Sequence, residues 1–350
     1  MKRLSSHGSN CRDVLLHDKE LLFVIETVQT LPMWIVKVKV YFNKIFVYLL
    51  KFTKKTVLSG YYIMEKKLET LIKERSGNCP TYTKHKPANP ELIQNELVSF
   101  DFIRGLGFLT PEVIYSTGTT FSTRYVSGTS VFRVLELLHK ENDIKTISHI
   151  LNLLCKSLNR IHNNTDLLNF PQTQKYDTET KIGEVCDFLE EENEGLANEI
   201  RERIPKIAEV FEEAKTPFFD RTPKNYIIPG VAESSIDTTY LRSLEQSDIL
   251  YFDFTSTGDL TFECDDYVSL LFHYCVTDDL RKTLLEKYSI DLNSRENIVC
   301  TFVRLSRFWV RRAYYKKVHP EAYQKRYLYE NFNYYQEKMF EYTDKMIRVI

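Results

Sequence analysis

Residues 218–228 read Phe-Phe-Asp-Arg-Thr-Pro-Lys-Asn-Tyr-Ile-Ile, a short polar loop that runs directly into an apolar strand. Asp220 and Asn225 stand five residues apart in this loop, and Pro223 stiffens the turn between them. A second segment, residues 249–254, reads Ile-Leu-Tyr-Phe-Asp-Phe and brings a carboxylate to the end of another apolar strand. We expect the rest of the chain to be organised around these two segments.

The polar side chains of the two segments have two interpretations. In the first, Asp220 handles a proton while Asn225 and Asp253 hold Mg²⁺ against the phosphates of a nucleotide, which is the arrangement that phosphoryl transfer requires. In the second, Asp, Asn and Pro are ordinary turn residues with a structural role only. Each segment alone favours the second interpretation, but the two together and in this order favour the first.

The pattern Asp-x-x-Pro-x-Asn, then an apolar strand, then Tyr-Phe-Asp-Phe, resembles the catalytic core of the protein-kinase-like superfamily. It is most similar to the small-molecule branch, the aminoglycoside phosphotransferase and choline kinase group. In that group an Asp opens a helix shortly after the second carboxylate, and residues 264–271, which contain Asp265 and Asp266, fit that pattern. The resemblance covers roughly residues 56 to 350.

This resemblance implies an α+β, bilobal fold with a small N-lobe, built from an antiparallel sheet and a helix, and a larger, mainly helical C-lobe. It implies an ATP- and Mg²⁺-dependent phosphotransferase that acts on a hydroxyl group of a small molecule. Asp220 would be the general base, and Asn225 and Asp253 would be the metal ligands.

The resemblance also implies a lysine that binds the nucleotide phosphates. Residues 81–86 alternate so that Lys84 and Lys86 lie on one face of a strand. We prefer Lys84, because it lies inside the strand whereas Lys86 immediately precedes Pro87. Lys73 is a third candidate.

Two further residues complete the expected nucleotide site. Residues 90–103 have apolar side chains at helical spacing, and Glu96 within them is the candidate ion-pair partner of Lys84. Gly60 lies at the turn of a predicted hairpin, residues 56–63, where backbone amides would cover the phosphates. An ordinary hairpin turn is the alternative for Gly60.

We divide the chain into an N-terminal extension (residues 1–55), an N-lobe (56–127) and a C-lobe (128–350), with Gly128 as the pivot between the lobes. We expect about five strands before Gly128. The most apolar run, residues 34–52, does not predict a membrane span. The lysines that interrupt it are Lys37, Lys39, Lys44 and Lys51. We expect the extension to pack against the N-lobe, with a basic amphipathic helix on a membrane surface as the alternative.

Four features depart from the superfamily pattern. Phe218 stands where the superfamily has a histidine, which weakens the assignment. Thr255 follows Asp253-Phe254 where the small-molecule group often has a second acid, so metal chelation would rest on Asp253 and Asn225. The loop of residues 229–247 is longer than usual, and an Ala-Pro-Glu segment is absent after Asp253, which argues against a eukaryotic-type protein kinase.

Composition limits the partners. The 47 basic and 48 acidic residues nearly cancel, so no polyelectrolyte partner is implied. The basic and aromatic residues between 304 and 326 predict long basic side chains lying over apolar surface rather than a nucleic-acid site. The acidic segment of residues 183–215 is expected to be a solvated face, with attraction of a cationic substrate as the alternative. The seven cysteines form no CxxC pair, which favours reduced thiols in the cytoplasm.

Two classes of function therefore stay open. One is the phosphotransferase, and the other is a kinase-like pseudoenzyme that acts as a binding or scaffold module, which the residues at Phe218 and Thr255 make credible. The presence of Asp220, Asn225 and Asp253 together favours the enzyme. His162, at the end of a predicted helix, is expected to be a buried structural histidine.

Overall fold

The computed structural model describes residues 81–85, 90–164, 174–175, 177–254, 259–273, 275–321, 323 and 332–350. All of these belong to the unit that spans Arg75–Ile350. Several predictions lie outside the described residues, namely those on residues 1–55, Gly60, Lys73, Lys86 and Thr255. The boundaries proposed after residues 55 and 127 stay predictions.

The described strands are short, and helices lie between several of them. The strands are β1 (Thr81–His85), β2 (Val113–Ser116), β3 (Thr120–Arg124), β4 (Gly128–Ser130), β5 (Gln174–Lys175), β6 (Thr216–Pro217), β7 (Tyr226–Pro229), β8 (Leu250–Tyr251) and β9 (Asp259–Thr261). The α-helices are α3 (Pro90–Gly105), α4 (Val131–Lys140), α5 (Ile144–His162), α6 (Thr178–Glu190), α7 (Glu194–Arg201), α8 (Ile204–Glu212), α9 (Thr238–Ser243), α10 (Cys264–Leu271), α11 (Asp278–Lys287), α12 (Arg295–Val318) and α14 (Phe332–Val349). Two 3-10 turns are η3 (Pro223–Asn225) and η4 (Gln246–Asp248).

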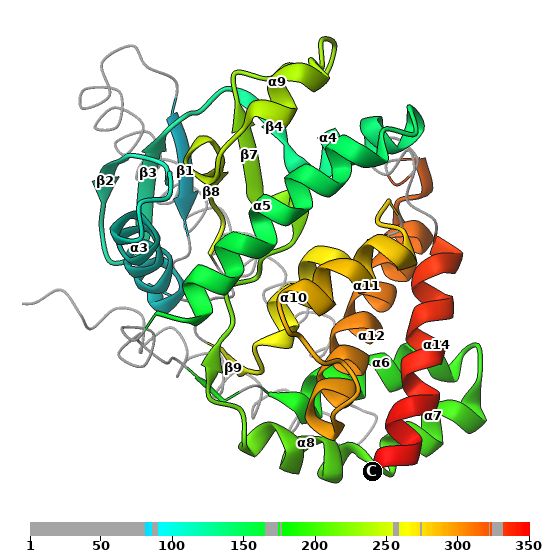
Figure 1. Cartoon of the computed structure of the whole chain (residues 1–350). Helices are drawn as coiled ribbons and strands as arrows, with labels where there is room; N and C mark the ends of the chain where they lie inside the picture. The colour runs from blue at the N-terminus through cyan, green and yellow to red at the C-terminus, as the bar shows by residue number, and fades with distance from the viewer. Residues whose placement is uncertain are drawn as a thin grey trace, which may run out of the picture. The chain divides into compact units, whose positions relative to one another are not determined.

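The first sheet carries the predicted lysine strand. Its order is β1-β3-β2 and both pairs are antiparallel. Helix α3 packs against β3, and Phe100 meets Phe121 edge to face with 5.8 Å between the ring centroids. Figure 1 shows this sheet and helix in blue and cyan. The predicted antiparallel sheet with the Glu96 helix against it is confirmed.

The second sheet, with the order β4-β7-β8, joins the two candidate site segments. β7 follows the Asp220 loop, β8 precedes Asp253, and Tyr226 pairs with Tyr251 between them. Gly128, the proposed pivot between the lobes, lies at the start of β4 opposite Pro229. A Cβ atom there would lie 2.4 Å from the Ile228 carbonyl oxygen, so close approach of two strands explains this glycine.

The rest of the described chain is mainly helical. One face of α5, formed by Ile147, Leu151, Leu154, Leu158 and Ile161, is fully buried, because these apolar residues recur at helical spacing toward one core. Helices α12 and α14 lie side by side, as the orange and red ribbons of Figure 1 show, and Trp309 of α12 is buried. Over the described residues, no helix combines the length and apolar character needed to cross a bilayer. The predicted α+β fold with a small antiparallel sheet and a larger helical part is confirmed.

Candidate active site

Lys84 lies at the centre of an ion-pair network. Strand β1 pairs it with Phe121 and leaves its side chain 12% exposed. Its Nζ donates to Glu96 Oε2 at 2.6 Å and to Asp253 Oδ1 at 2.8 Å. Burial alone would lower the pKa of Lys84, but the two carboxylates outweigh it and hold the pKa above its usual value. The structure therefore brings together three residues that the sequence assigned to one site.

Asp253 is held in an uncommon backbone conformation directly after β8. Its φ is +55°, in the left-handed region. The Arg221 Nη2 donates to its carbonyl oxygen at 3.1 Å, and the next amide, of Phe254, donates to Glu96 Oε1 at 3.4 Å. The side chain stays 44% exposed and is therefore accessible to a ligand.

The Asp220 loop has a matching geometry. Asp220 also has a positive φ, +53°. The 3-10 turn η3 brings Asn225 back to the loop, where its Nδ2 donates to the Asp220 carbonyl oxygen at 2.5 Å and lies 3.4 Å from the Asp253 carbonyl oxygen. One side-chain amide therefore ties the two candidate segments together.

Arg221 and Asp266 make a second set of contacts, which holds the backbone of the Asp220 loop. The Asp266 carboxylate accepts the backbone amides of Phe219 at 3.3 Å and Arg221 at 3.2 Å. The buried Arg221 side chain donates to the Phe219 carbonyl oxygen at 2.6 Å and lies 4.0 Å from the centroid of the Phe254 ring. Sequence reasoning placed Asp266 in the family pattern but missed Arg221, whose only signal was its position next to Asp220.

Phe218, which departs from the superfamily pattern, contacts a side chain that was not predicted from the sequence. The guanidinium carbon of Arg304 lies 3.9 Å from the centroid of its ring. Arg304 donates to both carboxylate oxygens of Asp265, at 2.6 and 2.7 Å. An aromatic ring under a bidentate Arg–Asp pair thus takes the expected histidine position. The His162 side chain is buried, with its Nε2 3.3 Å from Asp266 Oδ2 and its ring next to those of Phe219 and Tyr267, as expected of a structural histidine.

Burial raises the pKa of Asp220 above its ordinary value. The guanidinium groups of Arg304, Arg221 and Arg311 oppose this effect, and Asp253 adds to it. A carboxylate with a raised pKa is better matched to proton transfer near neutral pH than an ordinary one.

Two cavities meet at Asp253. The first, of about 220 Å³, is lined by Lys84, Glu96 and Asp253 together with apolar and aromatic side chains, which suits a nucleotide base. The second, of about 450 Å³, is lined by Asp220, Asn225 and Asp253 among others. Phe252 and Asp253 line both. Asp253 therefore lies between a space that reaches Lys84 and one that reaches Asp220.

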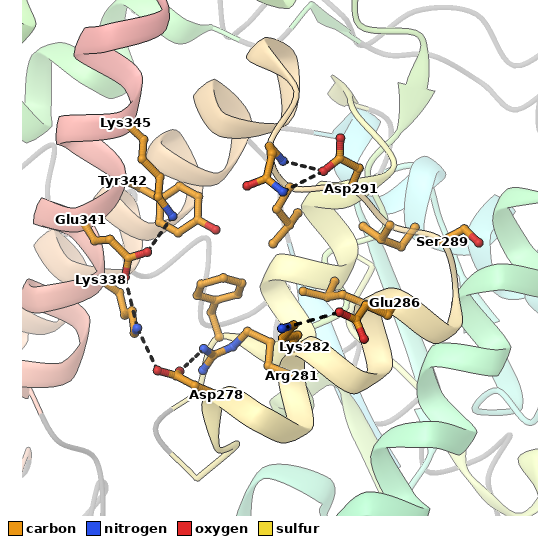
Figure 2. A pocket seen from close by; sticks show the side chains of 15 residues that line it. Asp278, Arg281, Lys282, Glu286, Ser289, Asp291, Lys338, Glu341, Tyr342 and Lys345 are labelled. Atoms are coloured by element: carbon orange, nitrogen blue, oxygen red, sulfur yellow. Dashed lines mark hydrogen bonds and ion pairs between the residues drawn. The ribbon is translucent and has the colours of Figure 1, made fainter.

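A third cavity, of about 650 Å³, lies between α11 and α14 and contains none of the candidate residues (Figure 2). Many of its charged groups are engaged with one another. Asp278 pairs with Arg281 and with Lys338, and Glu341 pairs with Lys338 at 3.1 Å and with Lys345 at 2.7 Å. Size alone therefore does not identify the site.

The residues present fit the expected metal. Among the described residues, no three His, Cys, Asp or Glu side chains form a metal cluster. A Mg²⁺ site does not require such a cluster, since Mg²⁺ commonly takes one or two protein oxygens together with substrate phosphates and water. Asn225 directs its Nδ2 to the loop backbone, which leaves its side-chain oxygen for another partner, and Asp253 offers a part-exposed carboxylate to the same cavity.

No protein-family model matches the sequence, and no curated protein matches it. Among solved structures, the chain is similar to a choline/ethanolamine kinase family protein from Mesorhizobium loti, with 12% identity and a TM-score of 0.46 over 76% of this chain and 82% of that one. It is similar to an ethanolamine kinase of Plasmodium vivax, with 12% identity and a TM-score of 0.44 over 76% of each chain. It is also similar to ADP-bound aminoglycoside phosphotransferase APH(2'')-Ib, with 12% identity and a TM-score of 0.44 over 77% and 87%. The likeness to these small-molecule kinases is one of fold.

Proposed function

We propose that the chain transfers the terminal phosphoryl group of ATP to a hydroxyl group of a small molecule. Asp220 is the general base, Asn225 and Asp253 are the Mg²⁺ ligands, and Lys84, oriented by Glu96, contacts the nucleotide phosphates. Gly60 is assigned to the phosphate cover from its place in the sequence.

The observation that carries this proposal is the double contact of Lys84. Its Nζ reaches Glu96 and Asp253 at once, although Asp253 lies 169 residues away in the sequence. In phosphotransfer sites of the kinase-like type, the phosphate-binding lysine pairs with a helix glutamate close to the carboxylate that binds the metal, and the two contacts of Lys84 match that arrangement. The shared position of Asp253 between two cavities supports the same interpretation.

Each residue then has one task. When bound, Mg²⁺ neutralises the charge of the transferred phosphoryl group. Lys84 and Glu96 fix where the phosphates lie, and Asn225 holds the Asp220 loop against the backbone of Asp253. Asp220 orients the acceptor hydroxyl and takes its proton while the new bond to phosphorus forms.

A mass-shift assay tests this function. Wild-type protein, ATP and Mg²⁺ are incubated with a panel of small alcohols, and a product that carries one added phosphoryl group is expected. Asp253→Asn should abolish the product, whereas Asp187→Asn, on the exposed face of α6, should not. Tight nucleotide binding without product from any alcohol would contradict the proposal and support the pseudoenzyme.

A further inference from the structure

The cavity beside Asp220 is lined by more cationic than anionic side chains. Three cationic side chains line it: Lys224, Arg311 and Arg312. Among the described residues that line it, the carboxylates are Asp220 and Asp253, and Asp253 already pairs with Lys84. We propose, resting on the proposed function, that the acceptor is an anion: a small hydroxyl compound that carries a carboxylate or a phosphate group.

Lys224 comes from the candidate loop itself. It immediately precedes Asn225 in the 3-10 turn η3, so its backbone is fixed with the catalytic residues. Its Nζ lies 4.5 Å from the centroid of the Phe132 ring, and its side chain is part-exposed. The turn fixes the backbone of Lys224, and its ammonium, a compact charge on a flexible stem, can reach an anion in the cavity.

Arg312 and Arg311 come from a different element that lines the same cavity, helix α12. The guanidinium carbon of Arg312 lies 4.4 Å from the Tyr335 ring centroid, its Nη1 donates to the Phe308 carbonyl oxygen at 3.3 Å, and the residue is 8% exposed. Arg311 is exposed and close enough to Asp220 to oppose the rise of its pKa. Positive charge therefore reaches the cavity of the candidate base from two separate elements, η3 and α12.

His273 also lines the cavity, and the same positive charges act on its pKa. Burial first, and then the charges of Arg312 and Lys224, hold the pKa of His273 well below its usual value. Its ring nitrogens contact the Ser269 carbonyl oxygen at 3.0 Å and the Tyr335 hydroxyl at 2.9 Å. A cationic acceptor would meet these same charges as repulsion, and an anionic one as attraction.

The alternative occupant of these cations is the nucleotide. The cavity that Lys84 and Glu96 line has its own cation near the phosphates, however, and Arg124 also borders it. Lys224, Arg311 and Arg312 lie in the cavity on the Asp220 side, where the acceptor hydroxyl must be. The experiment below separates the two occupants.

The test compares three alcohols that share a three-carbon frame and differ in charge: glycerol 3-phosphate, glycerol and 3-amino-1,2-propanediol. Their affinities are measured by calorimetry at low ionic strength, with the protein saturated by Mg²⁺ and a non-hydrolysable ATP analogue. The wild-type protein should bind glycerol 3-phosphate at least about tenfold more tightly than the other two, as hydrogen bonds to charged groups provide.

The variant is the double substitution Lys224→Gln with Arg311→Gln. Both side chains reach solvent, so the variant should fold, and the melting temperature checks this. The variant should lose about tenfold in affinity for glycerol 3-phosphate, leave the affinity for glycerol unchanged, and bind the amine at least as tightly as the wild type does, because repulsion is relieved. Lys317→Gln is the matched control, because Lys317 is 59% exposed on the same helix and pairs with Glu191. Affinity for the ATP analogue should be the same in all of them.

Equal binding of the three alcohols, including no binding by any of them, would overturn the proposal. Tighter binding of the amine than of glycerol 3-phosphate would also overturn it. A loss of affinity for the ATP analogue in the double variant would do the same. These outcomes leave the proposed function standing if the analogue binds with Mg²⁺. Failure of the analogue itself to bind would instead remove the proposed function and this inference with it.

Discussion

Asp220 and Asp253 share a backbone conformation that costs free energy for any residue except glycine. Their φ angles are +53° and +55°, and only two other non-glycine residues of the described chain, Asn142 and Ser289, have a positive φ. Such conformations cost of order 1 to 3 kcal/mol each and persist where the surroundings impose them. Here the Asn225 amide holds the Asp220 carbonyl oxygen, and Arg221 holds that of Asp253. The strain therefore falls on the two carboxylates proposed to do the chemistry.

Asp220→Asn isolates the proton-transfer role of this side chain. Asn has nearly the same shape and tolerates the left-handed region, but it takes no proton at neutral pH. Turnover should fall by about 10²- to 10⁴-fold, while the melting temperature and the Mg²⁺–ATP affinity stay close to those of the wild type. Steady-state kinetics, calorimetry and a melting curve on one preparation give all three values. A variant that loses stability yet keeps its turnover per folded molecule would show that Asp220 only supports the turn.

His273 gives the stability a dependence on pH that can be assigned to one residue. Its pKa is held well below its usual value, first by burial and then by Arg312 and Lys224, so the folded protein keeps it neutral. The unfolded chain binds a proton there below about pH 6.5. Stability from this residue is therefore full above that pH and is lost as the pH falls toward the folded-state value.

Between pH 6.5 and 5, the free energy of unfolding of the wild type should fall more steeply than that of His273→Gln. The difference in slope should approach about 1.4 kcal/mol per pH unit, the value for one proton. Urea unfolding at several pH values measures both slopes. Parallel slopes would mean that His273 takes up its proton equally in the folded and unfolded states.

Among the elements, the pairing of β4 with β7 fixes the Asp220 loop, since β7 begins directly after Asn225. Gly128→Ala tests this pairing, because its Cβ would lie 2.4 Å from the Ile228 carbonyl oxygen. The free energy of unfolding should fall by about 1 to 3 kcal/mol, as for other overpacked positions. Gly118→Ala is the control, since a Cβ there meets no atom within 4 Å. Equal stability of the two variants would show that β4 can move away from β7 without cost.

The elements also show how far sequence reasoning reached. Local patterns placed Lys84 on a strand and Glu96 on a helix, and the resemblance to the kinase-like superfamily implied that they pair. Asp253 was noted because it ends an apolar strand. The contacts that hold these residues were not predicted. The Asp266 carboxylate accepts a hydrogen bond from the backbone amide of Arg221, 45 residues earlier in the sequence. Arg304 donates to Asp265, 39 residues earlier. Such partners are chosen by the packing of distant elements, and no local periodicity in the sequence records them.

At the scale of the described molecule, the sheet of β1, β2 and β3 meets the helical part at Asp253. Lys84 brings the first sheet to this carboxylate, and Asn225 and Arg221 bring the loop from the helical part. The charge around Asp220 was not predicted in this form, because the sequence placed the basic residues of α12 over apolar surface without relating them to the loop. Arg312 does lie over Tyr335 as predicted, and it lines the cavity as well.

The most direct test of the central claim is the stabilisation of the protein by ATP with and without Mg²⁺. Ligand binding at a hundred times Kd raises the free energy of unfolding by about 2.7 kcal/mol, so a metal-dependent gain in affinity appears as a higher Tm. We expect ATP to raise the Tm of the wild type more with Mg²⁺ than without it. Asp253→Asn should lose this Mg²⁺-dependent increment, and Asp187→Asn should keep it. Equal Mg²⁺-dependent shifts in the wild type and in Asp253→Asn would contradict the account, because Asp253 would then not hold the metal against the nucleotide.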